Sequence, residues 1–244
     1  MRLAILDFCN PDPVFDKRGS IAEQTLAWIA PELPEAVFTS IHIAGGAAFP
    51  DPEDFNGFIL TGSEKGVYDE TPWMAPLRAF LIDAREARRP LFGICFGHQI
   101  MADTFGGKAV KASTGFEIGV RTYQLNGDGA PGSLSGHVAH QDQVVEVPPD
   151  AEVIATASYC PVAALRYAFP AQSIQFHPEY AADLIADAIE DFDGKYLTSE
   201  EAERGRVSMR SANVPKDLYA KETATFFRMH WNKDRSAYSV SGNT

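Results

Sequence analysis

Cysteine, basic residues and long apolar runs are all scarce in this 244-residue sequence, and each shortage excludes a class of protein. The three cysteines, Cys9, Cys95 and Cys160, lie far apart and form no Cys-x-x-Cys pair. A disulfide framework or a cysteine-rich zinc site is therefore not expected, and we predict a reducing, cytoplasmic location. An odd number of cysteines also leaves at least one that needs another explanation.

Lysine and arginine number 21 against 33 aspartates and glutamates, which gives a formal net charge of −12. Phosphate groups bind to basic surfaces, so neither nucleic acid nor an anionic membrane is expected as a partner. No segment approaches the ~18 consecutive apolar residues of a membrane-spanning helix. The apolar run at the N-terminus is too short for a signal peptide and is typical of a first buried strand.

The first hundred residues alternate short apolar runs with amphipathic stretches, a rhythm typical of a parallel sheet with helices on both faces. The expected strands there are 3–9, 36–43, 55–60 and 90–94, and the expected helices are 21–29, 73–88 and 98–105. Residues 108–177 are instead turn-rich and strand-like, which predicts an antiparallel region added to the sheet. Its clearest strands are 120–125, 144–147, 153–157, 162–167 and 173–176, followed by a helix at 181–192.

Beyond Gly194 the sequence becomes polar and charged, and then amphipathic over residues 218–231. The amphipathic spacing is typical of a helix that packs on the rest of the protein. We predict two units: residues 1–194 as the main domain, and residues 195–244 as a C-terminal helical extension packed on it. Residues 236–244 are expected to be a loose end.

Residues 91–100 hold the most informative pattern, an apolar strand that runs into Gly93-Ile94-Cys95-Phe96-Gly97 and then directly into a helical pattern. A sharp strand-to-helix turn needs small neighbours, and it exposes its central side chain where open α/β folds bind ligands. Free N–H groups at the start of the helix favour a thiolate and can stabilise an oxyanion. Cys95 is therefore the candidate nucleophile; the alternative is a small core residue with closely packed glycine neighbours.

His177 is the candidate base, because residues 173–177 are typical of a strand that ends at Pro178 and leaves the imidazole at its rim. Glu179 follows two positions later, and a carboxylate beside an imidazole fixes its tautomer and favours the imidazolium. A thiol nucleophile needs such a base and such an orienting group. We predict a triad of Cys95, His177 and Glu179; the alternative is a surface turn with incidental polar residues.

These segments together resemble the class I (triad) glutamine amidotransferases. Residues 93–99 and 176–179 match two motifs of that family in the right order, and residues 58–63 are similar to its oxyanion strand and loop. With residues 67–73, the chain more narrowly resembles stand-alone proteins similar to the amidotransferase domain of GMP synthase. The resemblance covers about residues 1–194. It implies a flavodoxin-like α/β fold: an open, mostly parallel sheet flanked by helices, here with an added antiparallel region and a C-terminal helical appendage.

The resemblance also implies site residues beyond the triad. The N–H groups of Gly62 and Phe96 would form the oxyanion hole. Gln99 would hold the substrate, and the backbone around Gln141 and Asp142 would hold the α-carboxylate and α-amino groups of glutamine. The family usually has glycine where Gln141 stands.

The implied reaction is cleavage of the γ-amide of glutamine or of a γ-glutamyl compound through a thioester on Cys95, which releases ammonia or an amine. It needs no metal and no organic cofactor. The chain would act as the glutaminase of a separate synthase partner, as a free-standing γ-glutamyl peptidase or hydrolase, or as a non-catalytic relative, which the intact triad disfavours. A cysteine α/β-hydrolase is the structural rival, but its acid precedes its histidine by many residues, whereas Glu179 follows His177.

Overall fold

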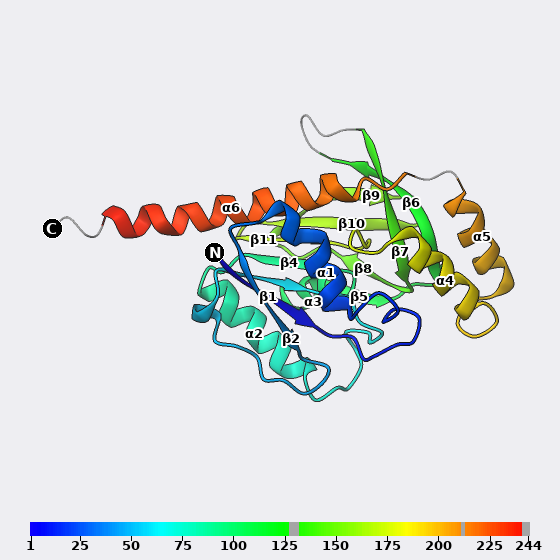
Figure 1. Ribbon diagram of the computed structural model, residues 1–244, viewed down its shortest axis with the longest axis horizontal. Helices are drawn as coiled ribbons and strands as arrows, with labels where there is room; N and C mark the ends of the chain where they lie inside the picture. Colours follow the sequence, from blue (N-terminus) through cyan, green and yellow to red (C-terminus); the bar gives the residue numbers. More distant parts are fainter. Residues whose placement is uncertain (127–131, 211–212, 241–244) are drawn as a thin grey trace.

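The computed structural model describes residues 1–126, 132–210 and 213–240. At its centre is a nine-stranded sheet in the order β2-β1-β3-β4-β11-β10-β9-β6-β7, with helices lying against it (Figure 1). The first five strands of that order are parallel and the remaining ones pair antiparallel. The predicted mostly parallel α/β sheet with an added antiparallel region is confirmed.

The parallel half consists of five strands predicted from apolar runs. They are β1 (Arg2–Asp7), β2 (Val37–His42), β3 (Gly57–Leu60), β4 (Leu91–Ile94) and β11 (Ala171–Ile174). Every residue of β3 and β4 is buried, which explains their uninterrupted apolar sequences. The carboxyl ends of β3, β4 and β11 meet at one edge of the sheet, where the loops that hold the predicted site residues begin.

The antiparallel half contains two strands that the sequence did not predict individually, β5 and β7. The strands of this region are β5 (Lys108–Lys111), β6 (Glu117–Leu125), β7 (Ser133–His140), β8 (Asp142–Glu146), β9 (Ala151–Ala157) and β10 (Cys160–Tyr167). β5 and β8 form a separate two-stranded sheet. β7 is rich in serine, glycine and histidine, so its ladder with β6 defines it rather than an apolar run.

Helices cover both faces of the sheet. Side chains alternate along β1, so Ala4 and Leu6 pack with α2 and α3, whereas Leu3 and Ile5 pack with α1 and α6. A third apolar cluster joins α4 and α5 to β6. The helices are α1 (Ile21–Ile29), α2 (Met74–Glu86), α3 (Phe96–Thr104), α4 (Ala182–Phe192), α5 (Ser199–Met209) and α6 (Lys216–Val240), with short 3-10 turns η1 (Ala30–Glu32) and η2 (Pro52–Asp54).

The C-terminal segments are helical, as the appendage predicts. α5 begins at a capping box of Thr198 and Glu201, in which each side chain accepts the backbone N–H of the other residue. α6 packs along α1 (Figure 1). The prediction of a loose end from residue 236 is wrong as far as Val240, because α6 continues to that residue; residues 241–244 lie outside the described residues.

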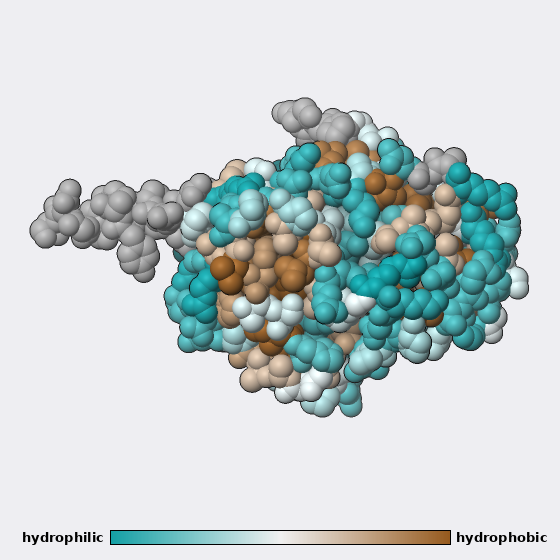
Figure 2. All heavy atoms as spheres, viewed as in Figure 1, coloured by the Kyte–Doolittle hydropathy of each residue, from teal (hydrophilic) through white to brown (hydrophobic). Residues whose placement is uncertain are grey.

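Hydrophilic residues predominate on the face shown in Figure 2. A hydrophobic area interrupts them near the edge strand β2, whose Val37 is 66% exposed. Among the helices of the described residues, none is both long enough and apolar enough to cross a lipid bilayer.

Candidate active site

Cys95 lies between the end of β4 and the start of α3, and its backbone is strained. Its φ of 53° and ψ of −103° fall in a region that residues other than glycine rarely adopt. A side chain on Gly93 would lie 2.6 Å from the backbone of Gly97, and one on Gly97 would lie 2.6 Å from the carbonyl oxygen of Leu60. The turn therefore requires both glycines, and the Cys95 N–H donates to the Ile174 carbonyl at 2.8 Å.

His177 and Glu179 meet just beyond the end of β11. Nδ1 of His177 lies 2.6 Å from Oε1 of Glu179, a separation typical of a charge-assisted hydrogen bond. The His177 backbone N–H donates to the carbonyl of His137 at 2.8 Å. The imidazole also stacks on the ring of Tyr180, with centroids 4.1 Å apart and planes 5° from parallel. The Glu179 carboxylate and the stacked Tyr180 ring thus fix the orientation of the imidazole, and the bond to His137 fixes its backbone.

The side chains of His177 and Cys95 are near neighbours, because both lie against Gly62. Burial lowers the pKa of His177, but the charges of Glu179 and Cys95 more than offset this effect and raise it from 6.5 to about 10. The imidazole is therefore protonated at neutral pH and can pair with a thiolate. Cys95, His177 and Glu179 are 5%, 2% and 4% exposed, so the three side chains are largely shielded from water.

Gly62 follows β3 and lies against both the thiol and the imidazole. A Cβ atom on Gly62 would be 3.1 Å from Cε1 of His177 and 3.7 Å from Cβ of Cys95. Among the described residues, the backbone N–H groups of Gly62 and Phe96 find no hydrogen-bond acceptor. Two uncommitted N–H donors near a nucleophile are the components that an oxyanion hole requires.

A chain of hydrogen bonds links Gln99 and Asp142 to the thiol. Nε2 of Gln99 donates to the Asp142 carbonyl at 2.9 Å and to Oε1 of Gln175 at 3.2 Å. Nε2 of Gln175 in turn donates to Sγ of Cys95 at 3.6 Å. The structure therefore brings two of the predicted substrate-binding residues into one network with the nucleophile.

Gln141 and the carboxylate of Asp142 lie at the other end of this network, where β7 passes into β8. The Gln141 carbonyl accepts the backbone N–H of Ala112 at 3.1 Å, which fixes the loop in which the family usually has glycine. Burial raises the pKa of Asp142, and the Tyr68 hydroxyl, which donates to its Oδ1 at 3.1 Å, partly reverses that effect. The half-buried carboxylate of Asp142 is thus the acidic group of the loop between β7 and β8.

Sequence reasoning missed two residues that contact the triad, Gln175 and Tyr180. Gln175 is fully buried and donates to the Cys95 sulfur, although it lies only two positions before His177. Tyr180 stacks on His177 and contacts Phe15 at a centroid separation of 5.4 Å. Their proximity in sequence to His177 was the available signal, since residues beside the end of a strand share its edge of the sheet.

His98 and Cys160 are engaged away from the reacting groups. Nδ1 of His98 lies 2.8 Å from the Ser173 hydroxyl and Nε2 lies 3.1 Å from the Val162 carbonyl, and burial lowers the pKa of His98 to about 4. Cys160 is a buried free thiol. In the part of the chain that the structure describes, no three His, Cys, Asp or Glu side chains are grouped to hold a metal ion.

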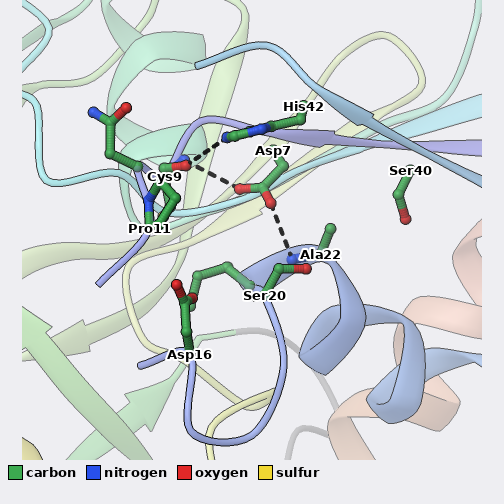
Figure 3. Close-up of a pocket in the computed structure, with 10 residues that line it drawn as sticks. Asp7, Cys9, Pro11, Asp16, Ser20, Ala22, Ser40 and His42 are labelled. Carbon is green, nitrogen blue, oxygen red and sulfur yellow. Dashed lines mark hydrogen bonds between the residues drawn. The ribbon is translucent and has the colours of Figure 1, made fainter. Parts of the chain in front are cut away.

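A cavity of about 180 Å³ adjoins the site, between the ends of β1 and β2 and the start of α1 (Figure 3). Cys9 lines it and donates its thiol to the Gly62 carbonyl at 3.2 Å. The Asp7 carboxylate in the same cavity accepts the N–H groups of Cys9 at 3.1 Å and Ala22 at 3.4 Å. Asp7 therefore holds the end of β1 to the start of α1. Cys9 itself is a partly exposed free thiol.

A family model for class-I glutamine amidotransferases matches residues 53–191. The chain is 27% identical to γ-glutamyl peptidase 3 of Arabidopsis thaliana over 74% of this chain and 78% of the peptidase. It is 29% identical to γ-glutamyl peptidase 5 of the same organism over 67% of this chain and 71% of that protein. It is also 36% identical to the glutamine-hydrolysing GMP synthase of Aliivibrio fischeri, over 53% of this chain but 25% of the synthase.

Solved structures share the fold over almost the whole chain. A glutamine amidotransferase from Methylobacillus flagellatus superimposes with a TM-score of 0.73 and 20% identity, covering 95% of this chain and 94% of that one. One from Thermotoga maritima gives a TM-score of 0.66 and 18% identity, with 96% of each chain covered.

Proposed function

Because the chain belongs to the class-I glutamine amidotransferase family, we propose that it is a cysteine-dependent hydrolase of the γ-amide bond in γ-glutamyl compounds. The observation that carries this proposal is the juxtaposition of Cys95, His177 and Glu179 at the carboxyl edge of the sheet. The similarity to the two γ-glutamyl peptidases extends over most of their length, which supports a γ-glutamyl peptide or amide as the substrate class.

In the first half of the reaction, the Cys95 thiolate adds to the γ-carbonyl carbon of the substrate. The carbonyl oxygen becomes an oxyanion that the N–H groups of Gly62 and Phe96 stabilise. The C–N bond then breaks, and the His177 imidazolium gives its proton to the leaving nitrogen. The products of this half are a free amine or ammonia and a γ-glutamyl thioester on Cys95.

In the second half, neutral His177 takes a proton from water, and the resulting hydroxide adds to the thioester carbonyl. The C–S bond breaks, which releases the γ-glutamyl group as a free carboxylic acid and restores the thiolate and imidazolium pair. Glu179 holds the imidazole by its Nδ1–H and stabilises its positive charge through both halves. The residues of this chain supply every proton transfer, so the proposed reaction uses no metal and no organic cofactor.

Substrate binding is assigned to Gln99, Gln141 and Asp142. Their network reaches the sulfur through Gln175, so a glutamyl group held there would have its side-chain carbonyl near Cys95. The carboxylate of Asp142 is suited to an α-ammonium group, and backbone groups around Gln141 are suited to an α-carboxylate. A charged amino acid head group is thus recognised by groups outside the triad.

The second candidate is a glutaminase that hands ammonia to a separate synthase. Its support is the 36% identity to a glutamine-hydrolysing GMP synthase. Both candidates share the thioester chemistry and differ in the leaving group and in the partner. The three free thiols support a reducing compartment, which we take to be the cytoplasm, and the net charge of −12 supports a small-molecule substrate rather than a nucleic acid.

A substrate panel on the purified chain tests the proposal. Glutamine, γ-glutamyl dipeptides and γ-glutamyl amides are compared, and ammonia and amine release are read separately. We expect efficient release of amines by the chain alone and loss of turnover in Cys95→Ala and Cys95→Ser, with thermal unfolding close to the parent. Ammonia release that requires an added synthase favours the second candidate. Turnover that survives both Cys95 variants overturns the nucleophile assignment.

A further inference from the structure

The first turn of α6 lies against the backbone of Glu179. Lys216, the first residue of the helix, is half-buried, and its Nζ donates to the main-chain carbonyl of Glu179 at 3.2 Å. The Lys216 carbonyl accepts the indole N–H of Trp28 at 3.1 Å. One turn later, the Tyr219 hydroxyl donates to the carbonyl of Ser135 at 3.2 Å. Bonds to α1, to β7 and to the Glu179 segment therefore hold this end of α6.

Phe227 and Arg228, about three turns further along, also anchor α6. Phe227 is fully buried and lies in the apolar cluster that contains α1 and one face of β1. Arg228 binds the carboxylate of Glu35 at 2.6 Å and the carbonyl of Glu32 at 2.7 Å. A helix fixed along several turns presents its first side chain at a defined place, so the position of Lys216 is set by the fold.

The Glu179 carboxylate is buried and lacks one hydrogen bond to the residues that the structure describes, and the ammonium of Lys216 lies nearby. Its Oε1 binds His177, but its Oε2 is buried and, among the described residues, has no hydrogen-bond partner. A buried carboxylate oxygen that lacks hydrogen bonds is costly unless a nearby cation compensates its charge. Burial lowers the pKa of Lys216, and Glu179 is the foremost of the acidic groups that raise it in return, ahead of Asp217 and Asp183. The hydrogen bond of the ammonium goes to the main chain of Glu179, and it places the positive charge near the carboxylate of the same residue.

We propose that Lys216 is a positioning residue of the active site, whose ammonium holds the Glu179 segment in place and offsets the charge of its carboxylate so that Glu179 holds His177 as the imidazolium partner of Cys95. This inference rests on the proposed function for its catalytic readout. In this proposal α6 contributes a residue to the active site, although Lys216 lies well beyond residues 58–179, which carry the family motifs.

Four variants of the full chain separate this role from a purely structural one. Lys216→Met removes the cation and keeps most of the length of the side chain, whereas Lys216→Arg restores a cation. Tyr219→Phe removes a neighbouring anchor of the same helix turn without touching Glu179, and Lys221→Met removes an exposed lysine of α6. Each is assayed for kcat and KM with the best γ-glutamyl substrate, for the rate of Cys95 alkylation by iodoacetamide, and for thermal unfolding.

Loss of one compensating charge is expected to lower kcat about tenfold in Lys216→Met while KM stays within about twofold. Alkylation of Cys95 should slow by a similar factor, Lys216→Arg should recover most of both, and the two controls should match the parent. Parent-like kcat and alkylation in Lys216→Met, or a loss that Lys216→Arg does not repair although it folds, overturns the inference.

Alkylation also keeps the inference separate from the proposed function, because it needs no substrate. If the parent hydrolyses no γ-glutamyl compound, the proposed function fails while the alkylation rates still report whether Lys216 supports the ion pair. If Lys216→Met does not fold, Lys216→Arg and Lys216→Gln are compared instead. Slower alkylation in the folded glutamine variant then supports the role, and equal rates refute it.

Discussion

Replacing Glu179 with glutamine tests the electrostatics of the site most directly, because the substitution keeps the shape and removes the charge. Glu179 and Cys95 together raise the pKa of His177 to about 10 against the effect of burial. Without the Glu179 carboxylate, the effect of burial is less strongly opposed, and the pKa of His177 falls towards 6.5. At a pH between these two values the parent keeps its imidazolium and the variant does not, so the thiolate loses its counter-ion. We expect kcat/KM there to fall about a hundredfold.

The assay is a pH profile of kcat/KM for the parent and for Glu179→Gln. Loss of the imidazolium should place the alkaline limb near pH 10 in the parent and several units lower in the variant. Glu222→Gln, an exposed site on α6, is the matched control and should leave the profile unchanged. An alkaline limb that stays near pH 10 in Glu179→Gln would refute the reasoning, because some group other than Glu179 would then hold the proton.

The same shift predicts a stability difference with a definite sign. The folded-state pKa of His177 is raised, so its contribution to folding is fully present below pH 6.5 and is lost as the pH rises through about 10. Urea unfolding of Glu179→Gln should therefore show the largest loss of stability, relative to the parent, at the low end of this window. The two unfolding curves should converge towards its high end.

Two further substitutions test the packing and the hydrogen bonds of the site. Gly97→Ala would place a Cβ 2.6 Å from the Leu60 carbonyl oxygen, so urea unfolding should show a loss of stability of about 3 kcal/mol. Gly132→Ala is the control and should be neutral, because a Cβ there would have no atom of the described residues within 4 Å. Equal stabilities of the two variants would refute the steric argument. Gln175→Leu removes a donor to the Cys95 sulfur and should slow its alkylation by iodoacetamide about fivefold. An unchanged rate would show that this hydrogen bond does not support the thiolate.

Local signals in the sequence predicted the parallel half of the fold well. The predicted helix at 21–29 has those bounds in the structure, because the Ser20 cap and the Glu23 side chain define its start within four residues. β3 and β4 were predicted because both of their faces are buried and their sequences are continuously apolar. The edge strand β7 was not predicted individually, because its pairing with β6 is invisible in its own composition.

The residues of the candidate site were predictable where they lie close together in the sequence. Cys95 and its glycines occupy one turn, and His177 and Glu179 lie two positions apart, so each pair is visible in the sequence. Lys216 contacts the backbone of Glu179 across 37 positions, and no local pattern marks such a contact. Sequence reasoning could propose that a C-terminal extension packs on the main domain, but it could not indicate which of its side chains reaches the site.

The strand order explains how distant segments form one site. β3, β4 and β11 are neighbours in the sheet and run parallel, and Ile94 of β4 lies opposite Ile174 of β11. Their next few residues therefore leave the same edge side by side, which brings Gly62, Cys95 and His177 together. A slip of one residue between β4 and β11 would turn every side chain of one strand to the other face and separate the thiol from the imidazole. The buried apolar side chains that fix this register consequently fix the chemistry as well.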